Sequence, residues 1–189
     1  PLAGHIAIGH VRYSTTGSSL LTNTQPLLAS FAGGQSSLSH NGNITNAREL
    51  RAELEAQGSV FQTTIDSEVI VHLIARSKKA TLEEKIIDSL AKVHGAYCLT
   101  IMTRDKLIGV RDPHGFRPLC LGKFGDGYVI SSETCALDTI GAKFVRDIHT
   151  GELVVIDDSG VKSYSLGQAQ RPAPCVFEYI YFARADSVI

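Results

Sequence analysis

Two charged side chains, Arg12 and Asp66, are of types that can bind the two ends of one small zwitterion. Arg12 follows an apolar stretch, and a buried guanidinium needs an anionic partner because an unpaired buried charge is costly. That partner is either an internal carboxylate in a structural salt bridge or a ligand carboxylate held by both arms of the guanidinium. Asp66 precedes a predicted helix, where it would serve as an N-cap or hold a substrate ammonium. If both side chains bind ligand, that ligand is an α-amino acid.

The Asn41-Gly42 pair is a third candidate, because it follows an apolar stretch and precedes a predicted helix. Asn-Gly favours positive φ, so one interpretation is a plain turn between the two elements. The alternative is that the Asn41 side chain and the Gly42 N–H converge on one point, since glycine lets the backbone approach a ligand closely. Two such donors would form an oxyanion hole for acyl transfer.

Other sites find less support in the residue spacing. The four cysteines contain no CxxC pair and the seven histidines no HxH or HExxH, which argues against a local metal site. His10 and His40 are therefore expected to support a site or the core. The glycines of residues 122–127 match no phosphate-binding motif, and residues 111–118 are dense in turn formers. We expect turns and a rigid structural loop there.

The composition is that of one globular domain. The chain has 189 residues, 43% of them hydrophobic, and 18 Lys and Arg against 19 Asp and Glu. A net charge of -1 excludes broad electrostatic capture of nucleic acid or anionic membrane. No apolar run reaches the roughly 18 residues needed to span a bilayer. Sparse cysteines and the lack of a signal peptide predict the cytoplasm.

Apolar periodicity predicts strands, then helices, then strands again, which is the order of an α+β sandwich rather than of alternating βαβ units. The first strand, over residues 5–12, has small or apolar residues on both faces and should be covered on both sides. The other predicted strands are 27–31, 36–40, 97–102, 106–110, 119–123, 128–132 and a hairpin around 153–160; the helices are 47–57, 69–74, 82–90 and 136–140.

Six motifs, in order, are familiar together: GHVRYST (9–15), SHNGN (39–43), TIDSE (64–68), RDPHGFRPL (111–119), SETCA (132–136) and FEYIYFAR (177–184). The sequence resembles the class II glutamine amidotransferase domain of the amidophosphoribosyltransferase family over nearly its whole length. The last motif separates this family from other amidotransferases of the class. Ala185 departs from the family, which usually has proline there.

The resemblance implies an N-terminal-nucleophile hydrolase fold, a four-layer αββα sandwich with two antiparallel sheets packed face to face. In this family a free N-terminal cysteine attacks the side-chain amide of glutamine, releases ammonia and leaves a thioester that water hydrolyses to glutamate. Its α-amino group acts as the general base. No cysteine lies near the start of this chain, which begins at Pro1. The resemblance therefore implies that residues 1–189 are a partial domain, incomplete at its N-terminus, which hydrolyses no glutamine by itself; roughly 70 residues would precede Gly9.

Motif positions carry the family's site residues over to this sequence. Arg12 would bind the α-carboxylate of glutamine with Thr15 nearby, Asp66 would hold the α-amino group, and Asn41 and Gly42 would form the oxyanion hole. These roles agree with the zwitterion inferred from charge alone. The fragment would still bind glutamine poorly without its upstream segment.

In the family, ammonia passes to a downstream phosphoribosyltransferase domain, which is absent here. There, with Mg2+, it displaces pyrophosphate from phosphoribosyl pyrophosphate to give phosphoribosylamine, the first step of purine biosynthesis. The resemblance also implies a homo-oligomer. In one branch a cysteine at the place of Cys175 is a ligand of a structural [4Fe–4S] cluster whose other ligands lie downstream, and Cys175 alone leaves that cluster undecided.

Two alternatives stay open. The same fold could serve another acceptor, as in glucosamine-6-phosphate synthase, asparagine synthetase or glutamate synthase, although the motif at 177–184 argues against this. The chain could also be a non-catalytic sandwich used for regulation or subunit assembly. The identity of the upstream residues would decide this second question.

Overall fold

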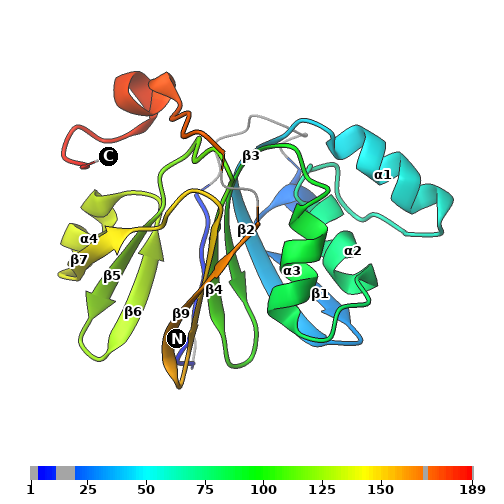
Figure 1. Cartoon of the computed structure of the whole chain (residues 1–189), viewed down its shortest axis with the longest axis horizontal. Helices are drawn as coiled ribbons and strands as arrows, with labels where there is room; N and C mark the ends of the chain where they lie inside the picture. Colours follow the sequence, from blue (N-terminus) through cyan, green and yellow to red (C-terminus); the bar gives the residue numbers. More distant parts are fainter. Residues whose placement is uncertain (1–3, 12–19, 168–169, 189) are drawn as a thin grey trace.

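Two antiparallel sheets form the centre of the structure, a computed structural model that describes residues 4–11, 20–167 and 170–188 (Figure 1). The larger sheet has the strand order β1-β2-β3-β4-β8-β9, and the smaller has the order β6-β5-β7. The strands are β1 (Leu27–Phe31), β2 (Gly34–Ile44), β3 (Gly95–Met102), β4 (Leu107–Arg111), β5 (Cys120–Phe124), β6 (Gly127–Ser131), β7 (Lys143–Asp147), β8 (Glu152–Asp157) and β9 (Gly160–Ser165).

Helices cover the outer faces of both sheets. Three lie against the larger sheet and α4 lies against the smaller one, which makes four layers in the order helix, sheet, sheet, helix (Figure 1). They are α1 (Ala47–Ala56), α2 (Glu68–Arg76), α3 (Leu82–Leu90) and α4 (Thr134–Ile140). Two short helical turns lie elsewhere in the chain: η1 (Leu21–Asn23) precedes β1, and η2 (Glu178–Phe182) follows β9.

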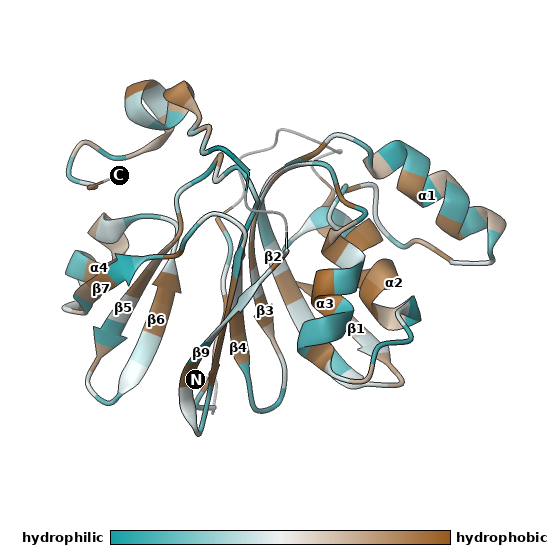
Figure 2. Cartoon of the chain, viewed as in Figure 1, coloured by the Kyte–Doolittle hydropathy of each residue, from teal (hydrophilic) through white to brown (hydrophobic). Residues whose placement is uncertain are grey.

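Alternation along the strands produces three separate hydrophobic cores. In β3, Leu99 packs with the three helices, whereas its neighbour Cys98 packs between the sheets. In β5, Leu121 belongs to the core between the sheets and Cys120 to the core under α4. Since successive side chains of a strand point to opposite faces, each sheet is buried on both sides. Figure 2 shows the resulting apolar bands along the central strands. The predicted α+β sandwich with four αββα layers is confirmed.

The chain crosses between the sheets at one corner, built from residues 111–119 and 148–151. Asp112 is fully buried; its Oδ1 accepts the N–H of His114 at 2.9 Å and its Oδ2 that of Phe116 at 3.2 Å. Burial raises the pKa of Asp112 despite these donors. The Arg111 guanidinium donates to the carbonyls of Arg117 and Ile148, and the second of these bonds links the two crossings. A backbone hydrogen bond from the Ile148 N–H to Leu119 O links them a second time. These hydrogen bonds make the loop a rigid corner, and its residues 117–119 also line the cavity described below.

Three expectations from the sequence were wrong in detail. No strand forms over residues 4–11, where Ile6 and Ile8 are half-buried but Val11 is 98% exposed, so only one side is covered. The strand predicted to end at residue 40 continues to Ile44. β7 was missed because it is an edge strand with four of its five residues exposed, which removes the period-two burial signal.

One carboxylate, Glu152 of β8, ties the two sheets together. Arg146 of β7 binds both of its oxygens at 2.7 and 2.8 Å, Ser163 Oγ of β9 donates at 2.6 Å, and the His149 N–H donates at 2.7 Å. The side chain is only 9% exposed. Burial alone would raise the pKa of Glu152, but these donors lower it from 4.5 to about 2.

Glu152→Gln should therefore lower the free energy of unfolding at neutral pH by about 1 to 3 kcal/mol, because solvent beside the pair screens part of the interaction that the difference in pKa implies. Because the folded pKa is lowered, this contribution is present above pH 4.5 and is lost as the pH falls toward about 2. Urea unfolding at a series of pH values measures it. Glu55→Gln, which removes an exposed ion pair with Arg51, is the control and should cost less than about 1 kcal/mol. Equal pH slopes in parent and Glu152→Gln would contradict the assignment.

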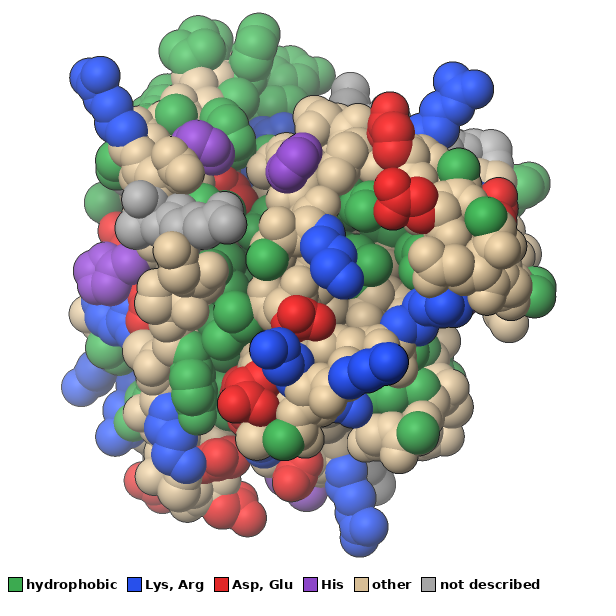
Figure 3. Space-filling view, turned by 45° about the vertical axis from the view of Figure 1, so that its right-hand side comes forward, with side chains coloured by type: hydrophobic (Ala, Val, Ile, Leu, Met, Phe, Trp, Pro, Cys, Tyr) green, Lys and Arg blue, Asp and Glu red, His purple; other side chains and the backbone are tan. Residues whose placement is uncertain are grey.

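Charged side chains are interspersed on the face shown in Figure 3, in keeping with the near-zero net charge. None of the helices in the described ranges combines the length and apolar character needed to cross a membrane.

Candidate active site

A cavity of about 560 Å³ lies where β2, β3 and β6 meet the corner between the sheets. Its lining includes three of the residues predicted from the sequence, Asn41, Gly42 and Asp66. They come from two separate elements, since Asn41 and Gly42 belong to β2 and Asp66 lies just before α2. The fold thus brings together groups 24 residues apart in the sequence.

Asp66 presents a carboxylate to this cavity and is held from behind. Its Oδ2 accepts the Ile44 N–H at 2.8 Å, and its Oδ1 accepts from Ser67 Oγ at 3.3 Å and lies 3.7 Å from His40 Nδ1. Burial raises the pKa of Asp66, but His40 and the Ile44 N–H more than offset it, so that the pKa lies below its ordinary value. The group is therefore ionised at neutral pH and suited to bind an ammonium.

The N-cap interpretation of Asp66 was wrong. Ser67, not Asp66, is the N-cap of α2, and its side chain makes no capping hydrogen bond. The Asp66 carboxylate instead accepts from β2, which fixes the start of α2 against the strand that carries Asn41.

His40 supports the site from inside the core, as expected. It is 4% exposed, its Nδ1 lies 2.8 Å from Ser67 Oγ and its Nε2 lies 3.3 Å from Ala96 O. The His40 N–H also donates to Gln25 Oε1 at 2.6 Å. The imidazole thus joins the Asp66 segment to β3, and both ring nitrogens are engaged.

Asn41 and Gly42 lie inside β2, opposite Cys98 and Tyr97 of β3, so the turn interpretation was wrong. Gly42 has φ +154°, and a Cβ there would lie 2.1 Å from Ala96 O. Only glycine lets the two strands approach this closely beside the cavity. The alternative interpretation, close backbone approach at a ligand site, agrees with this geometry.

Arg12 and Thr15 lie outside the described residues, so their part in the site stays a prediction. Their sequence neighbour Val11 lines the cavity, as do Gly9 and His10.

Sequence reasoning missed a second group in the cavity wall, Arg117, Glu178 and Phe182. Glu178 is 5% exposed and forms an ion pair with Arg117, whose guanidinium carbon lies 4.4 Å from the centre of the Phe182 ring. The sequence did mark these residues, because Arg117 belongs to the motif at 111–119 and the other two to the motif at 177–184. Nothing in their spacing, however, indicated that the two motifs touch.

The end of the chain packs on the SETCA motif. Glu133 Oε2 accepts the Arg184 N–H at 2.9 Å and the Ser187 hydroxyl at 2.6 Å. The segment of residues 176–181, which includes most of η2, leaves large side chains exposed, and they belong to the apolar region at the top of Figure 3. They are Val176, Phe177, Tyr179, Ile180 and Tyr181.

Two of the cysteines, Cys98 and Cys120, are poorly suited to be nucleophiles. Burial strongly raises the pKa of Cys98, and it raises the pKa of Cys120 to about 11. Cys135 is buried and Cys175 is half-buried. In the part of the chain that the structure describes, no three His, Cys, Asp or Glu side chains gather into a metal site.

Comparisons with known proteins agree with the motifs. Residues 10–139 match the family model described as "Glutamine amidotransferase domain". Amidophosphoribosyltransferase 2, chloroplastic, of Arabidopsis thaliana is 49% identical over 189 residues, which are all of this chain and 34% of that protein. The amidophosphoribosyltransferase of Staphylococcus aureus strain MRSA252 is 50% identical over 184 residues, or 97% of this chain and 37% of that protein. The chain spans about a third of the length of these curated relatives.

Solved structures support the same assignment. The glutamine phosphoribosylpyrophosphate amidotransferase from B. subtilis, complexed with ADP and GMP, matches with a TM-score of 0.90 at 46% identity, over 95% of this chain and 39% of that one. A glutamine aminotransferase class-II domain protein from Silicibacter pomeroyi, at 13% identity and a TM-score of 0.52, shares the fold alone. The four layers are thus those of an N-terminal-nucleophile hydrolase. Motifs, cavity and comparisons agree, and the chain belongs to the glutamine amidotransferase domain family.

Proposed function

We propose that this chain is the glutamine-hydrolysing part of an amidophosphoribosyltransferase. The observation that carries the proposal is one cavity lined both by Asp66, whose carboxylate is held ionised, and by the Asn41-Gly42 pair. The names of relatives about half identical to this chain support the choice of enzyme. The domain would be partial, and the nucleophilic cysteine would come from residues upstream of Pro1.

Glutamine would lie in the cavity with its two ends held by opposite charges. Asp66 would bind the α-ammonium, and Arg12, with Thr15, the α-carboxylate. The α-amino group of the N-terminal cysteine would take the thiol proton, and the sulfur would attack the side-chain amide carbon, forming a C–S bond and placing negative charge on the amide oxygen. The Asn41 side-chain N–H and the Gly42 backbone N–H would donate to that oxygen, where preorganised donors stabilise the transition state most.

Collapse of this intermediate would break the C–N bond, and ammonia would leave with a proton from the cysteine's α-amino group. Water would then add to the thioester carbon, release glutamate and return the proton to sulfur. His40 would position Asp66, because its Nδ1 lies 2.8 Å from Ser67 Oγ and 3.7 Å from Asp66 Oδ1.

The ammonia would react with phosphoribosyl pyrophosphate in the part of the protein that follows this chain, giving phosphoribosylamine and pyrophosphate as the opening step of purine synthesis. Mg2+ would act there. A [4Fe–4S] cluster could use Cys175 only with thiolates from outside the described residues, and no step here depends on it. A homo-oligomer in the cytoplasm is the expected form of the whole protein, although some relatives are named as chloroplastic.

Asp66→Asn in the full-length protein tests the proposal. Loss of the charge that binds the ammonium should raise the KM for glutamine by tenfold or more, the equivalent of about 1.4 kcal/mol of binding energy. Phosphoribosylamine formation from added ammonia and phosphoribosyl pyrophosphate should stay within about twofold of the parent, because it needs no glutamine. An unchanged KM would remove Asp66 from the substrate site. If no phosphoribosylamine formed from either nitrogen source in the parent protein, the choice of acceptor would be wrong.

A further inference from the structure

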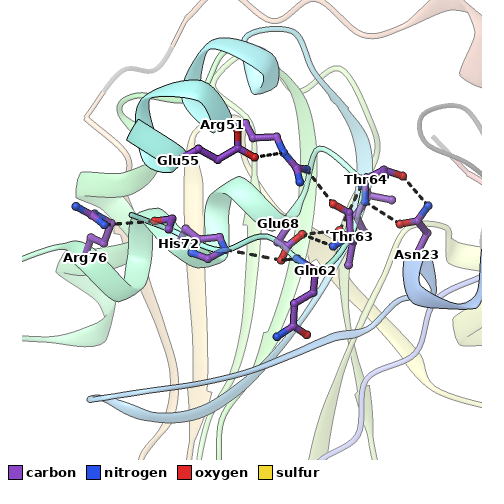
Figure 4. Close-up of polar contacts among 11 residues, drawn as sticks. Asn23, Arg51, Glu55, Gln62, Thr63, Thr64, Glu68, His72 and Arg76 are labelled. Atoms are coloured by element: carbon purple, nitrogen blue, oxygen red, sulfur yellow. Dashed lines mark hydrogen bonds and ion pairs between the residues drawn. The ribbon is translucent and has the colours of Figure 1, made fainter. Parts of the chain in front are cut away.

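Glu68 holds the segment that leads to Asp66 (Figure 4). It is the first residue of α2 and is 7% exposed. Its Oε1 accepts the Gln62 N–H at 2.8 Å, and its Oε2 accepts the Thr63 N–H at 2.8 Å and the Thr63 hydroxyl at 2.7 Å. These donors occupy three of the roughly four acceptor positions of an ionised carboxylate. They tie residues 62–63 to the helix that begins beside Asp66.

Asn23 holds the middle of the same segment, from 41 residues away in the sequence. It is fully buried; its Oδ1 accepts the Thr64 N–H at 2.9 Å and its Nδ2 donates to Thr64 Oγ1 at 2.8 Å. The reciprocal pair fixes Thr64 in both position and rotation. Asn23 ends the turn η1, so the segment before α2 is held against the start of the larger sheet as well (Figure 4).

An outer shell covers these contacts. Arg51 of α1 donates to Thr63 O at 2.9 Å, and its guanidinium carbon lies 4.2 Å from the centre of the Phe61 ring. The Phe61 ring in turn packs against His72 with the ring centroids 4.3 Å apart and the planes tilted by 46°, and His72 Nε2 lies 3.7 Å from Glu68 Oε1. The shell limits the access of water to Glu68, which makes its hydrogen bonds stronger.

Residues 59–67 contain no helix or strand, so side-chain contacts hold this segment. The Asp66 carboxylate itself is bound to Ile44 of β2, and Glu68 and Asn23 hold the residues that precede it. Burying a carboxylate is costly, and its three hydrogen bonds offset that cost only while the donors stay in place. Glu68 therefore fixes residues 62–63, the part of the segment that neither the Asp66 carboxylate nor Asn23 contacts. A shift of about 1 Å at a substrate-binding group can cost up to 10²-fold in rate.

We propose that Glu68 and Asn23 are positioning residues that set the distance of Asp66 from Asn41 and Gly42 and so determine the affinity for glutamine. This inference rests on the proposed function. It assigns neither residue a contact with substrate, because both act through the backbone of residues 62–66.

The first test is Glu68→Gln in the full-length protein, compared with Glu53→Gln, a charge-matched change at an exposed position of α1. In this variant the new side chain has an NH2 group in place of one carboxylate oxygen. That group faces one of the three donors and cannot accept its hydrogen bond. We expect the KM for glutamine to rise about tenfold with kcat within about twofold, and ammonia-dependent synthesis to stay unchanged. Glu53→Gln should match the parent. An equal fall of ammonia-dependent and glutamine-dependent activity would show a general structural role and overturn the inference.

A double-mutant cycle separates this inference from the proposed function. If Glu68 acts through Asp66, then adding Glu68→Gln to Asp66→Asn should raise the KM by less than about threefold, because coupled positions are not additive. A full tenfold increase in that background would overturn the inference and leave the role of Asp66 intact. If Asp66→Asn alone left the KM unchanged, the proposed substrate site itself would fail.

Two milder variants cover the case in which Glu68→Gln fails to fold. Thr63→Val keeps the shape of the side chain and removes the hydroxyl, which donates to Glu68 and accepts the Ile65 N–H at 3.3 Å, and Asn23→Ala removes both contacts to Thr64. Each should raise the KM for glutamine by about two- to fivefold, with kcat preserved, as expected for the loss of one or two hydrogen bonds at a distance. A KM equal to that of the parent in both variants would overturn the inference.

Discussion

Asn41→Ala in the full-length protein is expected to reduce glutamine-dependent turnover by about 10²-fold or more, because it removes one of the two proposed donors to the oxyanion. The side chain lies on β2 at the cavity wall, and β2 is paired to β3 on one side and to β1 on the other. Its position is thus set by the sheet, and truncation should leave the backbone in place. The loss should appear in kcat, since the donor acts on charge that develops only during reaction.

Ammonia-dependent synthesis is the internal control for this variant and should remain within about twofold of the parent. Asn41→Asp is the matched substitution, because it keeps the size of the side chain and replaces the donor by an acceptor. It should be at least as inactive with glutamine. A turnover within threefold of the parent for either variant would remove Asn41 from the oxyanion hole.

Gly42→Ala should abolish glutamine-dependent activity and also destabilise the fold. The new Cβ would lie 2.1 Å from Ala96 O and 2.8 Å from His40 Nε2, so β2 and β3 must separate beside the cavity. We expect the free energy of unfolding to fall by about 2 kcal/mol or more, from backbone strain and lost pairing. Urea unfolding and glutamine turnover measure the two effects.

Gly125→Ala is the control for Gly42→Ala. Gly125 also has a positive φ, of +57°, but a Cβ there would meet nothing within 4 Å. It should cost only the conformational penalty of about 1 kcal/mol and leave turnover unchanged. Equal losses of stability in the two variants would contradict the argument that strand approach, rather than φ alone, requires glycine at position 42.

Periodicity was enough to predict most elements of this fold. The helical stripes over 69–74 and 82–90 became α2 and α3, and α3 begins with a capping box between Thr81 and Glu84. The hairpin around 153–160 became β8 and β9. The two elements predicted wrongly depend on contacts with distant parts of the chain, which a local sequence pattern does not contain. Residues 4–11 have the composition of a strand but no ladder, and β7 pairs with β5 although its exposed residues show no alternation.

The candidate site was predictable in its residue types but not in its supports. Asp66 and the Asn41-Gly42 pair could be named from charge, glycine chemistry and family resemblance, and they line one cavity. The same Asn-Gly pair equally indicated a turn, and only the pairing with β3 separates the two outcomes. The contacts of Glu68 with Thr63, of Asn23 with Thr64 and of Arg117 with Glu178 depend on tertiary structure, and no spacing rule predicts them.

The corner at which the chain passes from one sheet to the other has a consequence for selectivity. The passages are residues 111–119 and 148–151. Arg111 and Leu119 of the first passage both form hydrogen bonds with Ile148 of the second. The buried Asp112 holds the first passage from within. These contacts fix the two sheets relative to one another at this corner. Under the proposed function, the cavity beside this corner would keep a constant size, and an amino acid one methylene shorter than glutamine would react at least about tenfold less efficiently.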